Sequence, residues 1–311
     1  MKLVLLFPGQ GSQHHQLLEY YQDPSHYHVL HTWLNQCSSL IKTNCIDLLA
    51  ERSSLIHQTE ITQPLILSHS LGVYHLLQPA LAHHDIVCVA GHSLGELTAA
   101  CAVGLFDTKQ AMILAHQRAV VMQECMLNRD IAMHVVLGGL SVAHIDQLIQ
   151  TIPDVWLVND NCDGQVVIGG LTSAVDDAIA VLKEAGARKI IPLPMSVVSH
   201  CPMLEQASVK FKSLLTQTPH KLQSSWPVAS NHTLTLTTDA EIIIDHLSQQ
   251  LVHRVQFRSM IQKIGQGIDL FIEVGPGSIL TNLVKKIIDV PCMNTSNSEQ
   301  LQAVCHLLKG K

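Results

Sequence analysis

The segment at 85–103 constrains the fold of this chain more than any other part of the sequence. An apolar run at 85–90 has the composition of a buried strand, the pentapeptide GHSLG follows at 91–95, and 97–103 is an apolar helical stretch. A strand, a tight turn and a helix in direct succession form the unit of an open α/β sheet. The segment therefore predicts an α/β protein with this strand inside a parallel sheet.

The pentapeptide also makes Ser93 the candidate nucleophile. In a G-x-S-x-G turn, small neighbours let the serine adopt a strained conformation with its hydroxyl exposed. The helix that follows directs its first amides at the same point, where they stabilise negative charge. A glycine-bounded turn with an incidental serine has the same letters, so only the position between a strand and a helix favours catalysis.

The middle of the chain has a different order of elements. Its apolar patterns predict strands and helices in the order β-α-β-β-α-β, at 133–137, 141–152, 156–158, 165–168, 172–185 and 189–193, with turns at 159–161 and 163–164. This order is typical of a ferredoxin-like domain. We therefore expect residues 126–197 to form a small inserted domain, and residues 1–125 and 198–311 to form the larger one.

The larger domain is predicted to contain strands at its two ends. A short apolar run at 2–7 stops at Pro8, and a second run at 268–274 stops at a Gly-Pro-Gly turn. The stretch 14–83 has mainly helical spacing, and helices resume after residue 197.

Composition excludes several classes of protein. Of the 311 residues 47% are hydrophobic, which predicts a sizeable core, and the net charge of −6 argues against a general nucleic-acid binder. The nine cysteines include no CxxC pair, a pattern of reduced thiols and not of a zinc site. The opening apolar run is too short for a signal peptide, and no run approaches the roughly 20 residues of a membrane span. We expect a soluble cytoplasmic protein without a membrane partner.

Three residues outside the pentapeptide are candidates for the same site. His200 follows the last strand of the expected insert, at a domain junction where clefts form, although any one of the 20 histidines has a structural explanation. Arg118 is an isolated cation in an apolar helical stretch, so it either reaches solvent or binds an anion such as a carboxylate. Gln10 lies in a glycine-flanked turn after the first strand, which is either a simple turn or a source of a backbone amide for an oxyanion.

Five motifs together resemble those of the malonyl-CoA:acyl carrier protein transacylases and the similar acyltransferases of polyketide synthases. They are FPGQGSQ at 7–13, GHSLGE at 91–96, RxxxMQ at 118–123, SHC at 199–201 and EVGPG at 273–277. The resemblance covers nearly the whole chain and keeps the family's order and spacing. It implies an α/β-hydrolase-like core with a parallel sheet and an inserted ferredoxin-like domain.

The resemblance also implies roles for single residues. Ser93 would be the acylated nucleophile, His200 its general base, and the backbone amides of Gln10 and Leu94 the oxyanion hole. A carbonyl near Gln250 would orient the histidine in place of a third, acidic residue, and the sequence Gln249-Gln250 leaves that position open by one.

Four residues are implied to contact the substrate. Arg118 would bind the free carboxylate of the malonyl group, and Met122 belongs to the same motif. His92 adjoins the nucleophile and would line the pocket, with Gln250 nearby.

The function that follows is a ping-pong transfer of a malonyl group from malonyl-CoA through Ser93 to the phosphopantetheine thiol of an acyl carrier protein. The resemblance implies no metal or redox cofactor, and we expect a monomer that binds no nucleic acid. Two alternatives stay open at this point. One is a hydrolase that removes acyl groups from carrier proteins with the same serine and histidine, and the other is a non-catalytic carrier-docking module.

Overall fold

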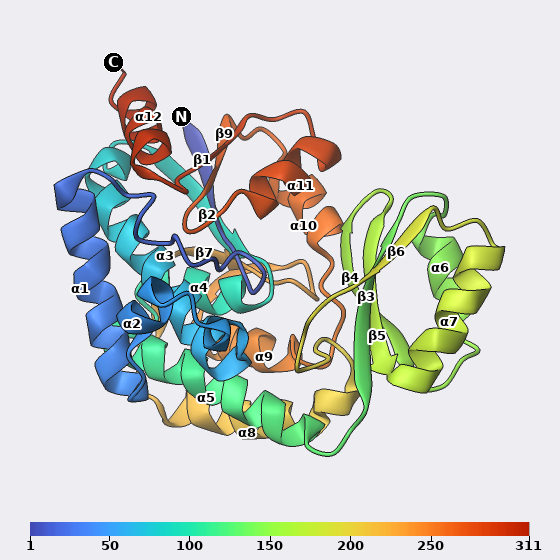
Figure 1. Ribbon diagram of the computed structural model, residues 1–311. Coiled ribbons are helices and arrows are strands. Elements are labelled where there is room, and N and C mark those ends of the chain that lie inside the picture. Colours follow the sequence, from blue (N-terminus) through green and yellow to red (C-terminus); the bar gives the residue numbers. More distant parts are fainter. Residues whose placement is uncertain (311) are drawn as a thin grey trace.

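The computed structural model describes residues 1–310 and contains two separate sheets (Figure 1). The larger sheet has six strands in the order β10-β9-β1-β2-β7-β8. Five of them are parallel, and β8 is an antiparallel strand at one edge. The bounds are β1 (Lys2–Phe7), β2 (Asp85–Gly91), β7 (Gln223–Ala229), β8 (Leu236–Asp239), β9 (Leu270–Glu273) and β10 (Cys292–Asn294).

Helices cover both faces of this sheet, because the central strands are apolar on both sides. In β1, Leu3 and Leu5 enter one core cluster with the helices α1, α3, α4, α5, α8, α9 and α12, whereas Val4 and Leu6 enter a second cluster with α10 and α11. The helices of the larger unit are α1 (Pro24–Ile41), α2 (Cys45–Ala50), α3 (Thr59–Leu81), α4 (Leu94–Ala102), α5 (Thr108–Met126), α8 (Glu205–Gln217), α9 (Ala240–Gln249), α10 (Phe257–Ile264), α11 (Ile279–Ile287) and α12 (Ser298–Leu308), with short 3-10 turns η1 (Ser54–His57) and η2 (Pro202–Leu204).

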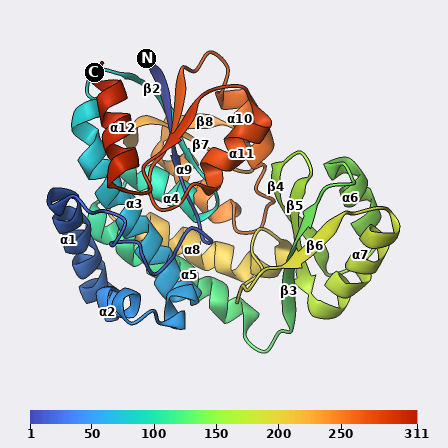
Figure 2. The ribbon, with the colours of Figure 1, turned by 45° about the horizontal axis from the view of Figure 1, so that its top comes forward.

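The smaller sheet has four strands in the order β4-β5-β3-β6, and every neighbouring pair is antiparallel. Its elements are β3 (Ile131–Leu137), α6 (Val142–Ile149), β4 (Val155–Cys162), β5 (Gln165–Leu171), α7 (Thr172–Glu184) and β6 (Lys189–Pro192). The β-α-β-β-α-β order and the α/β fold class are confirmed. Figures 1 and 2 both show this sheet with α6 and α7 beside the larger unit.

Two details of the sequence-based prediction are wrong. The turn predicted at 159–161 is strand, because β4 continues to Cys162 through two irregularities in its pairing with β5. The sequence pattern also misses the strands β7, β8 and β10, since β7 contains the polar start Gln-Ser-Ser and a proline, and the other two strands are only four and three residues long.

The expected domain boundaries at 126–197 enclose the smaller sheet, and they stay a prediction. Within residues 1–310, no helix is both long enough and apolar enough to cross a bilayer.

Candidate active site

The turn that carries Ser93 joins the end of β2 to the start of α4. Ser93 has φ 54° and ψ −113°, a conformation that costs a non-glycine residue about 1–3 kcal/mol. The flanking glycines make the turn possible: a Cβ atom on Gly91 would lie 2.0 Å from the carbonyl carbon of Gly95. The turn therefore holds the Ser93 hydroxyl at the end of the parallel sheet, where α4 begins.

His200 approaches Ser93 from the segment that follows the smaller sheet. Its Nε2 lies 2.8 Å from Ser93 Oγ, and its Nδ1 lies 2.8 Å from the backbone oxygen of Gln250. A carbonyl oxygen only accepts, so Nδ1 carries the proton and Nε2 is free to accept the proton of the serine hydroxyl. Of the two candidate glutamines, Gln250 supplies the carbonyl.

Burial keeps this imidazole neutral. Desolvation lowers the pKa of His200 to about 3, and the nearby Arg118 guanidinium and His92 act in the same direction. The histidine is therefore an unprotonated base throughout the neutral range.

Arg118 lies on α5 and does not reach solvent, since only 1% of it is exposed. Its Nη1 donates to Gln63 Oε1 at 2.7 Å, and its Nη2 donates to Gln250 Oε1 at 3.0 Å and to Ser93 Oγ at 3.4 Å. Within residues 1–310 no carboxylate forms a direct ion pair with it. Burial lowers its pKa to about 10, and the Glu96 charge opposes that shift, so the guanidinium stays charged at neutral pH.

The loop after β1 runs directly against the Ser93 turn. His92 donates its amide to Phe7 O at 3.1 Å, and a Cβ atom on Gly9 would lie 2.5 Å from His92 O and 3.7 Å from the amide nitrogen of Leu94. Among residues 1–310, neither the Gln10 amide nor the Leu94 amide donates to a protein acceptor. The two predicted oxyanion donors thus come from adjacent turns and remain available.

A cavity of about 240 Å³ lies between the two sheets beside this turn. The larger unit contributes Gln10 and His92 to its wall, and the smaller sheet contributes Val135, Asn161 and Gln165. His92 Nε2 is 2.8 Å from Asn161 Oδ1, so the two units meet through a hydrogen bond at the cavity.

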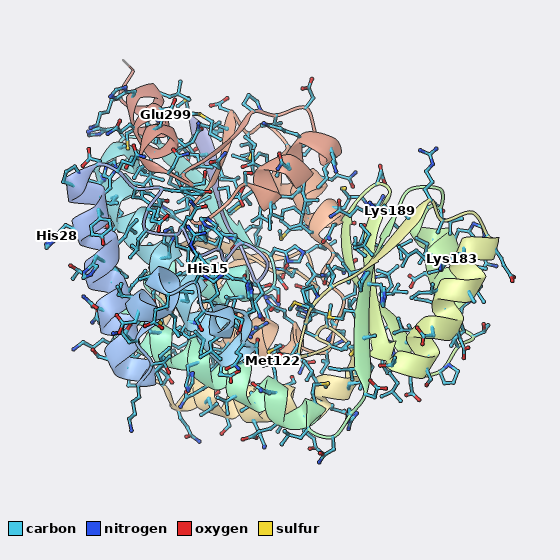
Figure 3. The ribbon with its side chains drawn as sticks, viewed as in Figure 1. His15, His28, Met122, Lys183, Lys189 and Glu299 are labelled. Atoms are coloured by element: carbon cyan, nitrogen blue, oxygen red, sulfur yellow. The ribbon has the colours of Figure 1, made fainter. Side chains whose placement is uncertain are left out.

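Met122, which is labelled in Figure 3, lies on α5. It follows Arg118 by four residues, about one helical turn. It is buried, and its sulfur accepts from Gln63 Nε2 at 3.6 Å. The structure thus places Met122 beside a partner of Arg118 and not in the wall of the cavity between the sheets.

Sequence reasoning assigned no role to four residues of this site. Gln63 binds Arg118, Asn161 binds His92, and Glu96 and Asn231 form a buried pair beneath the Ser93 turn. Glu96 had one available signal, because it belongs to the GHSLGE motif as a charged residue inside an apolar helix. In the part of the chain that the structure covers, no group of three or more histidine, cysteine or acidic side chains is placed to hold a metal ion.

Comparisons with known proteins identify the family of this chain. A family model described as acyl transferase domain matches residues 4–306. The chain is similar to the malonyl CoA-acyl carrier protein transacylases of Haemophilus influenzae, at 31% identity over 97% of this chain and 98% of that protein, and of Bacillus subtilis, at 32% over 92% and 90%.

Solved structures give the same result. The malonyl-CoA:acyl carrier protein transacylase of Helicobacter pylori superimposes with a TM-score of 0.94, at 32% identity over 99% of both chains. A malonyl-transacylase solved in complex with its type II PKS acyl-carrier protein gives a TM-score of 0.92, at 30% identity over 100% of both chains. The chain therefore belongs to the acyl transferase domain family, among the malonyl CoA-acyl carrier protein transacylases.

Proposed function

We propose that the protein transfers a malonyl group from malonyl-CoA, through an ester on Ser93, to the phosphopantetheine thiol of an acyl carrier protein. The position of Arg118 carries this proposal: a buried guanidinium lies 3.4 Å from the nucleophilic oxygen. In a malonyl thioester the carboxylate carbon and the reacting carbonyl carbon are separated by one methylene, about 2.5 Å apart. When Ser93 Oγ attacks the thioester carbon, the malonyl carboxylate therefore lies within reach of the Arg118 guanidinium.

The first half-reaction forms the ester. His200 Nε2 takes the hydroxyl proton while Ser93 Oγ attacks the thioester carbonyl, and the amides of Gln10 and Leu94 stabilise the oxyanion. The carbon–sulfur bond then breaks, and the coenzyme A sulfur leaves with the proton from His200. Loss of one oxyanion donor typically costs about 3 kcal/mol of barrier.

The second half-reaction repeats these steps in reverse order. The thiol of the carrier protein gives its proton to His200 and attacks the malonyl ester, and Ser93 regains its proton as the carbon–oxygen bond breaks. These steps use only side chains and backbone amides, so the proposal includes no metal or redox cofactor.

The proposal also includes the state and location of the protein. We expect it to act as a monomer in the cytoplasm, without a nucleic-acid or membrane partner.

The buried charge favours this transfer over the hydrolysis of simple acyl chains. An acyl group without a carboxylate leaves Arg118 in the interior with only amide oxygens and the serine as partners, and an uncompensated buried charge is costly. An apolar lining would suit a hydrolase for such chains better.

Mass spectrometry of the intact protein tests the proposal. We expect a malonyl adduct after mixing with malonyl-CoA, mapped to Ser93 in the wild-type chain and missing in Ser93→Ala. The isolated adduct should then transfer its malonyl group to a holo acyl carrier protein much faster than to water. A wild-type protein that takes up no malonyl group contradicts the proposal, and preferred transfer to water favours the hydrolase.

A further inference from the structure

Glu96 is a buried carboxylate at the centre of the site, and the reaction steps above do not use it. It lies in the first turn of α4 with 1% of its surface exposed. Its Oε2 accepts from the Asn231 amide at 2.9 Å, from Asn231 Nδ2, and from Gln250 Nε2 at 2.8 Å. One oxygen atom therefore joins two side-chain amides that come from different parts of the chain.

The first of these amides lies between two charges of opposite sign. Gln250 donates through Nε2 to Glu96 and accepts through Oε1 from Arg118 Nη2 at 3.0 Å. A guanidinium only donates and an ionised carboxylate only accepts, so the carboxamide has one orientation that satisfies both. Without an acceptor at position 96, the amide is free to rotate and to direct its NH₂ group at Arg118, where donor would face donor.

The second amide is fixed in the same way. Asn231 Nδ2 donates to Glu96 and, at 2.7 Å, to the carbonyl of Gly91. Two acceptors on the nitrogen side turn Asn231 Oδ1 toward the amide of Ser93, 3.4 Å away. Glu96 thus reaches the nucleophile through one amide and the arginine through the other.

We propose that Glu96 is a positioning residue that sets the preference for a carboxylated acyl group, because it fixes the Gln250 carboxamide that holds Arg118 in place. This inference rests on the proposed malonyl transfer. Glu96 touches neither the acyl group nor its carrier; it acts through Gln250 on Arg118, and more weakly through Asn231 on the Ser93 turn.

Acylation of the whole protein with malonyl-CoA and with acetyl-CoA separates this role from a structural one. The ratio of the two kcat/KM values is the measured quantity, because a misfolded fraction lowers both rates equally and leaves the ratio unchanged. We expect Glu96→Ala to lower the ratio at least tenfold. Glu96→Gln keeps an acceptor oxygen and should recover a large part of it.

A pH profile of the same ratio tests the ionised form and needs no variant. Desolvation raises the pKa of Glu96 to about 7. A protonated carboxyl keeps one acceptor oxygen, as the amide of Glu96→Gln does, but it loses the negative charge that strengthens the hydrogen bonds from Gln250 and Asn231. The ionised fraction falls about tenfold between pH 8 and pH 6, so the wild-type ratio should fall toward the value of Glu96→Gln, and Glu96→Gln itself should lose this pH dependence.

Other titratable groups near Glu96 do not account for the expected pH dependence of the ratio. Arg118 is the charged group that acts on it, and burial holds the pKa of His200, which is joined to it through Gln250, at about 3. Burial also lowers the pKa of the surrounding histidines, which are His92 on the preceding turn, His232 after β7 and His246 on α9. Any effect of these histidines remains in Glu96→Gln, whereas the effect of Glu96 does not.

Glu273→Gln is the matched control. Glu273 is equally buried, and its pKa is likewise raised to about 7, but it binds the amides of Leu280 and Thr281 at the start of α11. We expect this variant to lose thermal stability and to keep the wild-type ratio.

The outcomes separate the inference from the proposed function. If the wild-type protein takes up no malonyl group, the proposed function fails first. If it does, a Glu96→Ala ratio within twofold of wild type overturns the role of Glu96.

Discussion

At the scale of single residues, Arg118 keeps a full positive charge in the interior, and its hydrogen-bond partners are neutral oxygens. Gln63 and Gln250 accept its hydrogen bonds, and the nearest carboxylate, Glu96, is one carboxamide away. A direct ion pair would satisfy the guanidinium and would compete with an incoming anion. The arrangement keeps the arginine charged and, within residues 1–310, without a direct carboxylate partner, as the proposed binding of a malonyl carboxylate requires.

Substitutions at Arg118 should therefore separate acyl groups by charge. We expect Arg118→Ala to abolish malonyl acylation of Ser93, with acetyl acylation retained or raised. Arg118→Lys should lower malonyl kcat/KM about 100-fold, because an ammonium lacks the fork that reaches two amides and a carboxylate at once. Rates of ester formation from both acyl-CoAs measure this, and an equal loss of both would remove the assignment.

The sequence predicts some of these residues and not others, for a physical reason. Ser93, His200 and Arg118 each lie in a short motif whose local chemistry is unusual, such as a cation in an apolar helix. Gln63 and Asn231 are ordinary polar residues along the chain. They join the site only because folding brings them to Arg118 and Ser93, which are 55 and 138 residues away in sequence.

At the scale of secondary structure, α3 is a long helix that is buried over most of its length. Its stretch from Gln63 to Tyr74 is entirely buried, including the polar side chains of Ser68, His69 and Ser70. A helix that is apolar almost all round is easily predicted from sequence, and so is a strand–turn–helix unit such as β2–α4. The strands β7 and β10 are strands because they pair with β2 and β9. Such pairing joins distant parts of the chain, so the local sequence pattern does not predict it.

His69 should make the stability of the protein depend on pH. Burial lowers its pKa from 6.5 to about 3, so on acidification the unfolded chain takes up this proton first. The stability it contributes is complete above pH 6.5 and is lost as the pH falls toward 3. At pH 5 the loss from this one group is about 2 kcal/mol.

Urea unfolding of His69→Leu at two pH values checks this expectation. Relative to wild type, the variant should gain about 2 kcal/mol between pH 8 and pH 5, because it has no imidazole to protonate. The exposed His75 on the same helix provides the control, and His75→Leu should change the free energy of unfolding by less than about 0.5 kcal/mol. An unchanged difference for His69→Leu at the two pH values would contradict the buried neutral state.

At the scale of the whole molecule, the site lies where the two sheets meet, and a few polar contacts set their relation. Arg258 of α10 donates from Nε and Nη2 to the buried carboxylate of Asp160 in β4, at 2.9–3.2 Å. Val255 pairs with Asn159 beside it. The two-unit architecture could be predicted from the order of elements, but this junction could not, since residues 159–161 have the composition of a turn.

Breaking this junction should weaken both stability and substrate binding. Arg258→Met leaves Asp160 buried without its partner, which costs on the order of 3 kcal/mol, and should raise the KM for malonyl-CoA because Asn161 lies next to it in the cavity wall. Arg254→Met removes a partly exposed pair with Asp146 that also joins the two units and should cost under about 1 kcal/mol. Urea unfolding and acylation kinetics measure the two effects, and equal losses in both variants would contradict a special role for Arg258.

Gln250 gives its main chain to the base and its side chain to the arginine. A point mutation replaces a side chain and leaves the peptide carbonyl behind, so the proton on the imidazole is protected from ordinary genetic change in a way that a catalytic aspartate would not be. If the proposed roles hold, a substitution at position 250 should weaken the preference for malonyl groups more than it weakens acylation itself. Under the proposed roles, a substitution can therefore change the choice of acyl group without changing the hydrogen bond that orients His200, although Gln250 provides both contacts.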